Sequence, residues 1–76
     1  MAQKYYIKKI DTKTGEVSYK AHQKAQGWYG ESDKDIAWKF SKSGAKKIIE
    51  RYEYERDNFD YIWSKNTIWE LEEAEA

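Results

Sequence analysis

Two stretches near the amino terminus have the residue preferences of β-strands, and a turn separates them. Residues 4–10 are rich in tyrosine and isoleucine. In residues 16–21, polar or charged side chains alternate strictly with apolar or aromatic ones. Between them, Asp11 can cap a turn through its carboxylate, and Gly15 can take the positive φ that closes a bulged hairpin. The pattern therefore predicts a β-hairpin. In its second strand, one face would carry Val17, Tyr19 and Ala21, and the other face would carry Glu16, Ser18 and Lys20.

The next stretch, residues 22–35, has no regular period. Two aromatic rings lie between glycines in Gly27-Trp28-Tyr29-Gly30, which indicates either a short third strand or a tight aromatic turn. The polar residues 31–35 can begin a helical turn, with Ser32 or Asp33 as its N-cap. That turn would direct Ile36, Ala37 and Phe40 inward and Trp38 to the opposite side.

A helical period follows and predicts the main helix, from about residue 42 to residue 55. Ser41 is a favourable N-cap. Four apolar side chains recur at the spacing of a single helix face, namely Ala45, Ile48, Ile49 and Tyr52. Asn58 can adopt the left-handed conformation, so we expect the helix to end there.

The carboxyl-terminal segment resembles a second hairpin. Residues 59–64 and 67–72 each alternate, and Ser64-Lys65-Asn66 can form the turn between them. This register places Tyr61 opposite Trp69 and Phe59 opposite Leu71. Residues 73–76 would form a frayed acidic tail.

These elements predict a single α+β domain over residues 1–76. It would contain a small antiparallel sheet built from two hairpins, with one main helix packed on one face, in the order β-β-(β)-α-β-β. Ile, Leu, Val and Phe make up only 11 of the 76 residues, whereas 13 residues are Trp, Tyr or Phe. Most of the rings must therefore fill the core. We expect a monomer or weak dimer that folds without metal, cofactor or disulfide.

Composition excludes several kinds of chemistry. The chain has no cysteine and one histidine, His22, so thiolate sites, paired imidazoles and His-ligated metal sites are excluded. No glycine-rich phosphate loop is present, and the paired acidic residues lack a third polar partner. No apolar run exceeds three residues, which excludes a membrane span. We therefore expect a non-enzymatic protein with no catalytic, cofactor-binding or metal-binding residues.

Charge is divided unequally along the chain. Residues 1–47 contain eleven lysines and five acidic residues, a net charge of +6, and residues 48–76 have a net charge of −6. Two interpretations are open. The two halves can intermix in the fold, or they can form a polarised molecule with a basic and an acidic surface.

Three classes of function fit this pattern. The first is a protein-binding module whose contact surface comprises Trp28, Tyr29 and Trp38, with Lys24 and Lys34 at its rim. The second is a nucleic-acid-binding domain that uses the lysine-rich amino-terminal half, with Lys4, Lys8, Lys9, Lys20 and Lys24 beside stacking rings. The third, an acidic nucleic-acid mimic, is opposed by the eleven lysines. We favour a protein partner, with nucleic acid as the alternative.

Residues 34–49 resemble a pattern of small phage-encoded accessory proteins, in which a hairpin leads to an "Ala-x-x-Phe-Ser-x-x-x-Ala" helix start and a final strand follows. Ala37, Phe40, Ser41 and Ala45 match this pattern, whereas Gly44 departs from it and the second carboxyl-terminal strand is extra. The resemblance covers about half of the chain and implies a hairpin–helix–strand fold. It also implies a phage origin, a location in the cytoplasm of a bacterial host, and binding to a host factor such as a defence protein.

Overall fold

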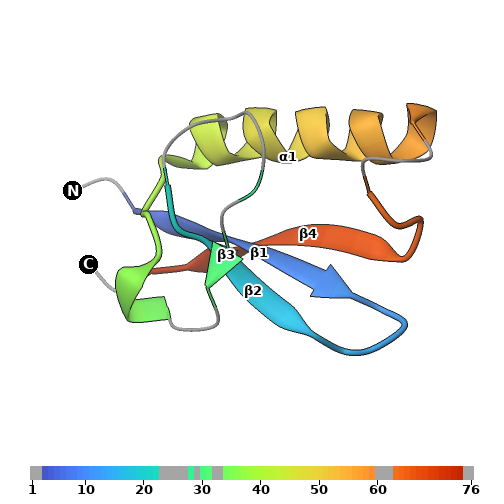
Figure 1. The fold of residues 1–76 in the computed structure, drawn as a ribbon. Coiled ribbons are helices and arrows are strands. Elements are labelled where there is room, and N and C mark those ends of the chain that lie inside the picture. Colours follow the sequence, from blue (N-terminus) through green and yellow to red (C-terminus); the bar gives the residue numbers. More distant parts are fainter. Residues whose placement is uncertain (1–2, 23–27, 29, 32–33, 60–62, 75–76) are drawn as a thin grey trace.

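A four-stranded antiparallel sheet and one long helix form two layers (Figure 1). The structure is a computed structural model and describes residues 3–22, 28, 30–31, 34–59 and 63–74. The strand order is β3-β2-β1-β4, so the first strand lies between the second and the last. The elements are β1 (Tyr5–Asp11), β2 (Val17–Lys20), β3 (Gly30–Glu31), the 3₁₀ turn η1 (Lys34–Ile36), α1 (Lys42–Asn58) and β4 (Thr67–Glu73). The predicted α+β class, with one main helix over a small antiparallel sheet, is confirmed.

The predicted amino-terminal hairpin is present. The Asp11 carboxylate accepts a hydrogen bond from the Lys13 N–H at 2.9 Å, and the Asp11 carbonyl accepts one from the Gly15 N–H at 2.7 Å. Gly15 has a φ of 81°, where a side chain would be strained. The turn chemistry in the sequence therefore identified this hairpin correctly.

β2 has the predicted alternation, but burial does not follow the polarity of its side chains. Lys20 is fully buried beneath α1, whereas Val17 is 39% exposed. The register pairs Lys9 with Ser18 and Lys8 with Tyr19, so β2 presents Ser18 and Lys20 on the face that α1 covers. Alternation shows which residues share a face, but the register with β1 determines which face the helix covers.

Of the two alternatives that the sequence offered for the middle of the chain, the structure contains the short third strand, which is β3. After η1, Phe40 is buried as predicted and exchanges two backbone hydrogen bonds of 2.8 Å with Tyr5. Trp38 is exposed, as predicted, at 46%. Ile36 was expected to face inward but is 56% exposed, because η1 is a single turn with no buried residue.

The main helix begins where the sequence predicts. Ser41 has extended backbone angles, and its hydroxyl accepts a hydrogen bond from the Gly44 N–H at 3.3 Å. The helix continues past residue 55 to Asn58, whose side-chain amide donates to the Tyr54 carbonyl at 2.8 Å. The expected left-handed ending is wrong: Phe59 follows in an extended conformation, and no described residue other than a glycine has a positive φ.

Aromatic rings fill the space between helix and sheet, as the composition predicted. Tyr52 is fully buried and stacks on Trp69 with ring centroids 5.4 Å apart. Trp63 packs edge-on against both rings, at 5.3 and 5.0 Å. Of the predicted apolar stripe, Ala45 and Tyr52 are buried, and Ile48 and Ile49 are partly buried against the same cluster.

The predicted carboxyl-terminal hairpin was wrong. β4 pairs with β1 instead, and Leu71 lies opposite Ile7 and Trp69 opposite Lys9. Of the segment expected to pair with it, Phe59, Trp63 and Ser64 are outside any strand, and Tyr61 lies outside the described residues. β1 offers a partner over its whole length of seven residues, and the Trp63 indole donates instead to the Glu55 carboxylate at 3.1 Å.

The expected acidic tail is shorter than predicted. Glu73 belongs to β4, and Ala74 is buried, with its N–H donating to the Lys4 carbonyl at 2.9 Å. Residues 75–76 lie outside the described part of the chain. Glu73 and Ala74 therefore belong to the fold and not to a tail.

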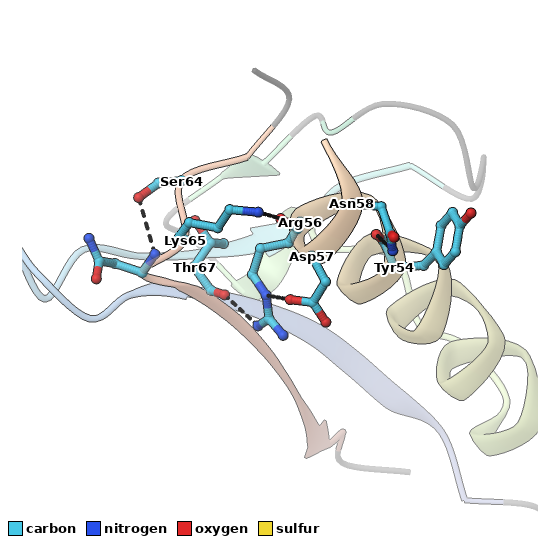
Figure 2. A network of polar contacts seen from close by, with 8 residues as sticks. Tyr54, Arg56, Asp57, Asn58, Ser64, Lys65 and Thr67 are labelled. Atoms are coloured by element: carbon cyan, nitrogen blue, oxygen red, sulfur yellow. Dashed lines mark hydrogen bonds and ion pairs between the residues drawn. The ribbon is translucent and has the colours of Figure 1, made fainter. Parts of the chain in front are cut away.

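Polar contacts hold the end of α1 against the start of β4 (Figure 2). The Arg56 guanidinium donates to the Thr67 carbonyl at 2.8 Å and to the Asp57 carboxylate at 3.0 Å. The Lys65 ammonium donates to the Arg56 carbonyl. These bonds fix the spacing between helix and strand at this end of the molecule.

Candidate functional site

On one face of the sheet, the only helical element among the described residues is the single turn η1 (Figure 1). The side chains of β1, β2 and β4 that point away from α1 form this surface, here called the open face, which comprises Tyr6, Lys8, Ile10, Val17, Tyr19, Ile68, Glu70 and Glu72. The η1 segment lies on this side of the sheet, opposite to α1 (Figure 1). The sheet is therefore covered on one face by the helix and bordered on the other by a single turn.

The end of the open face beside η1 combines rings and paired charges. Tyr6 and Tyr19 pack edge-on with centroids 5.9 Å apart. Glu72 lies at the centre of the cluster, because its carboxylate accepts from the Tyr19 hydroxyl at 3.3 Å and forms ion pairs with Lys34 at 3.0 Å and Lys8 at 3.5 Å. The hydrogen bond from Lys34 lowers the pKa of the Glu72 carboxyl and raises that of the Lys34 ammonium.

The other end of the open face is aliphatic. Ile10 pairs directly with Val17 on one side and with Ile68 on the other, so the three side chains form a row across three strands. Near η1, Tyr6 and three charged residues line a shallow hollow of about 360 Å³; the charged residues are Lys34, Asp35 and Lys39. The surface thus offers an apolar row, two rings and balanced charges.

The structure separates the site residues that the sequence predicted. Lys34 lies against the open face, and the exposed Trp38 follows it in the same segment. Trp28 lies on the other side of the sheet, where its ring contacts Tyr52 at 5.8 Å and Trp63 at 6.5 Å. Trp28 therefore contributes to the core. Tyr29 and Lys24 lie outside the described residues.

Most of the open face could not be predicted from the sequence. The alternation placed Val17 and Tyr19 on one face of their strand, without indicating which face the helix covers. Glu70 and Glu72 alternate with Trp69 and Leu71, a pattern that predicted a polar face for this strand without identifying its partners. Only the pairing of β1 with β4 brings Lys8 to these carboxylates.

A second unusual feature is the buried lysine on the helix side. Lys20 donates from its ammonium to the Tyr52 hydroxyl at 2.7 Å and lies over the rings of Trp28 and Tyr52, at 5.6 and 5.3 Å. Burial lowers the pKa of Lys20 to about 8 and raises that of Tyr52 to about 12. Since Lys20 has no exposed surface, its amine cannot reach a substrate, and its role is in the core.

Two other kinds of site, a metal centre and a membrane-spanning helix, are not found among the described residues. Within the described ranges, no group of three or more His, Cys, Asp or Glu side chains could hold a metal ion. No helix in the described part of the chain is both long enough and apolar enough to cross a membrane. Comparisons with protein-family models, curated proteins and solved structures found no match.

Proposed function

We propose that this protein is a non-enzymatic binding module whose partner is another protein. The observation that carries the proposal is the open face. It combines an aliphatic row, the partly buried Tyr6 packed on the buried Tyr19, and alternating charges, and α1 lies on the other side of the sheet (Figure 1). Two further apolar side chains are exposed in this segment, Ile36 at the end of η1 and Trp38 two residues later. Tyrosine, tryptophan and a polar rim are characteristic of protein interfaces.

The charges of this surface favour a protein over a nucleic acid. A phosphate backbone requires cations that are free to neutralise it. Lys8 is paired with two glutamates, Lys9 is half-buried on the helix side and Lys20 is fully buried. Three of the five lysines assigned to a nucleic-acid interface are therefore engaged within the fold.

The geometry also supports a non-enzymatic role. The described groups with the most displaced pKa values, Lys20 and Tyr52, are sealed in the core. The charged groups that line the hollow beside Tyr6 are exposed side chains of η1 and its neighbours. Binding needs only such a surface, whereas catalysis needs reactive groups in contact with a substrate. The resemblance to phage accessory proteins extends the proposal to bacterial host proteins, including defence factors, as partners in the host cytoplasm.

Two matched variants test the proposal. Trp38→Ala removes an exposed ring two residues after η1, and Tyr54→Ala removes a ring that is 62% exposed on α1. Both should leave the fold intact. For a protein captured stoichiometrically from a bacterial lysate and then purified, we expect Trp38→Ala to weaken binding by about 2 kcal/mol, roughly thirtyfold. Isothermal titration calorimetry measures both affinities, and Tyr54→Ala should bind like the wild type.

The same preparations should be titrated with single- and double-stranded nucleic acid at two salt concentrations. Micromolar binding that decreases steeply with salt, without a protein partner, would support the alternative function. Equal affinity of both variants for the purified partner would show that the contact surface lies elsewhere.

A further inference from the structure

The outer edge of β4 is a second surface, distinct from the open face. β4 is an edge strand, since β1 is its neighbour in the sheet order. The Ala74 N–H donates to the Lys4 carbonyl and the Thr12 N–H donates to the Asn66 carbonyl, so the even-numbered residues direct their backbone groups toward β1. The odd-numbered residues of an antiparallel strand then direct their N–H and C=O groups outward.

At one end of this edge the outward groups are already bonded. The Thr67 N–H donates to the Ser64 carbonyl, and the Thr67 carbonyl accepts from Arg56 (Figure 2). Further along, no hydrogen bond within the described part of the chain uses the outward N–H and C=O groups of Trp69, Leu71 and Glu73. An unpaired edge of this length is a template for another strand.

A groove runs beside this edge, between β4 and α1. It has a volume of about 540 Å³, and the partly buried Ile49 and Leu71 provide an apolar floor with Trp69. Trp69 is only 5% exposed, and its indole N–H has no hydrogen-bond partner among the described residues. A backbone that approached this edge would extend the apolar contact and supply carbonyl acceptors along the strand.

The charges around the groove are mainly acidic. Glu50 and Glu53 line it from α1, against one cation, Lys46, whereas the Glu70 carboxylate points to the open face, where it pairs with Lys8. In the described part of the chain, Glu50 and Glu53 form no ion pair. Arginine or lysine side chains could lay their aliphatic stems on Ile49 and Leu71 and reach these carboxylates.

We infer that the outer edge of β4 binds an extended, arginine- or lysine-rich peptide segment of a partner protein by adding it to the sheet as a fifth strand. Backbone hydrogen bonds to Trp69, Leu71 and Glu73 provide affinity, and the acidic groove selects basic side chains. This inference goes beyond the proposed function, because it concerns the edge of the sheet and not its open face. A second copy of this chain is a poorer occupant, since pairing two β4 edges would bring both sets of glutamates together.

The probe is an acetylated and amidated eight-residue peptide in which four arginines alternate with valine and threonine. Two isomers carry N-methyl groups, one on every arginine and the other on every intervening residue. They have the same side chains and charge, but each has only one edge able to donate hydrogen bonds. We expect one isomer to bind like the parent peptide and the other at least about tenfold more weakly, because a single edge of the peptide pairs with β4.

Amide hydrogen exchange measured by NMR locates the binding. The amides of Trp69, Leu71 and Glu73 should become protected on peptide addition, whereas those of Glu70 and Glu72, which face β1, should be protected already. Equal binding of both isomers, or protection that falls elsewhere, would overturn the inference. So would dimerisation of the free protein that protects the same three amides, because the occupant would then be a second copy.

Charge variants test the groove. Glu53→Lys should lower the affinity for the parent peptide by about tenfold. Glu16→Lys, an equal charge change in the exposed β1–β2 turn, should lower this affinity by less than about threefold. Equal loss in both would indicate attraction to overall charge and would refute a groove site. Trp38→Ala should leave peptide binding unchanged, so that the inference and the proposed function can fail separately.

Discussion

Lys20 is an unusual residue because its ammonium is buried among rings. A buried charge is costly unless it is paired and hydrogen-bonded. Here the Tyr52 hydroxyl accepts one bond, and the ring of Trp28, 5.6 Å from the ammonium, offers a cation–π contact. No carboxylate of the described residues forms an ion pair with Lys20. The compensation is partial, as the lowered pKa of about 8 indicates.

This pKa predicts how stability changes with pH. Unfolded, the Lys20 amine titrates near its ordinary value of 10.5. Between pH 8 and 10 the unfolded chain therefore holds a proton that the folded chain has lost, and the Lys20 contribution to the free energy of unfolding rises with pH. Tyr52 has the opposite effect only above pH 10, because its pKa rises from 10.0 to about 12 on folding.

We expect the stability of the wild type to rise relative to that of Lys20→Met as the pH increases from 7 to 9.5. Urea unfolding followed by tryptophan fluorescence measures this difference at each pH. Lys47→Met, a change at an exposed helix position, serves as the control and should follow the wild-type profile. Parallel profiles for the wild type and Lys20→Met would mean that Lys20 titrates normally.

At the scale of elements, the helix start is determined by its own residues. The Ser41 hydroxyl satisfies one of the backbone donors that the first turn leaves unpaired. Ser41→Ala should lower the free energy of unfolding by about 1 kcal/mol. Ser43→Ala, at an exposed position two residues further along the chain, should change the free energy of unfolding little. Thermal melts compare the two, and equal losses would show that the cap contributes nothing specific.

Local elements of this kind could be predicted from the sequence, because neighbouring residues determine them. Gly15 with Asp11 identified the hairpin, and Ser41 identified the helix start. The partner of β4 could not be predicted in this way. Its alternation suits any neighbouring strand, and the choice of β1 depends on contacts between residues about sixty positions apart, such as Ile7 and Leu71.

The candidate site depends on the same long-range pairing. The sequence identified Lys34 and the exposed Trp38, but it grouped them with Trp28, which packs beneath the helix. Aromatic composition alone cannot distinguish a ring in the core from a ring on the surface. The covered face is determined by the position of α1 over Ile7 and Lys20, and that position follows from tertiary packing.

At the scale of the whole molecule, the pairing of β1 with β4 brings the two charged halves of the chain together. Lys8 from the basic half contacts Glu70 and Glu72 from the acidic half, and Lys34 contacts Glu72. Of the two interpretations of the divided charge, these ion pairs favour intermixing. Individually, exposed pairs contribute only about 0–1 kcal/mol. Their positions still matter, since they join η1 to the open face.

Glu72 is the residue through which this connection can be tested. Its carboxylate contacts Lys34 from η1, Lys8 from β1 and the Tyr19 hydroxyl from β2. Glu72→Gln keeps the shape of the side chain and removes the charge. We expect faster amide exchange in residues 34–38 and unchanged exchange in α1, because the substitution weakens the ion pair between η1 and the sheet. Hydrogen exchange followed by mass spectrometry or NMR resolves the two segments.

Acid should have the same effect on the wild type. The contacts with Lys34 hold the pKa of Glu72 below its ordinary value of 4.5, so the stability that it contributes is fully present above pH 4.5. That contribution is lost as the pH falls through the lower pKa of the folded state, and exchange in residues 34–38, corrected for the intrinsic rate, should then approach that of Glu72→Gln. Asp57→Asn, which removes another carboxylate with a lowered pKa, is the matched control because Asp57 contacts Arg56 at the far end of α1. Exchange in residues 34–38 that responds equally to both substitutions would show that η1 is held in place by something other than Glu72.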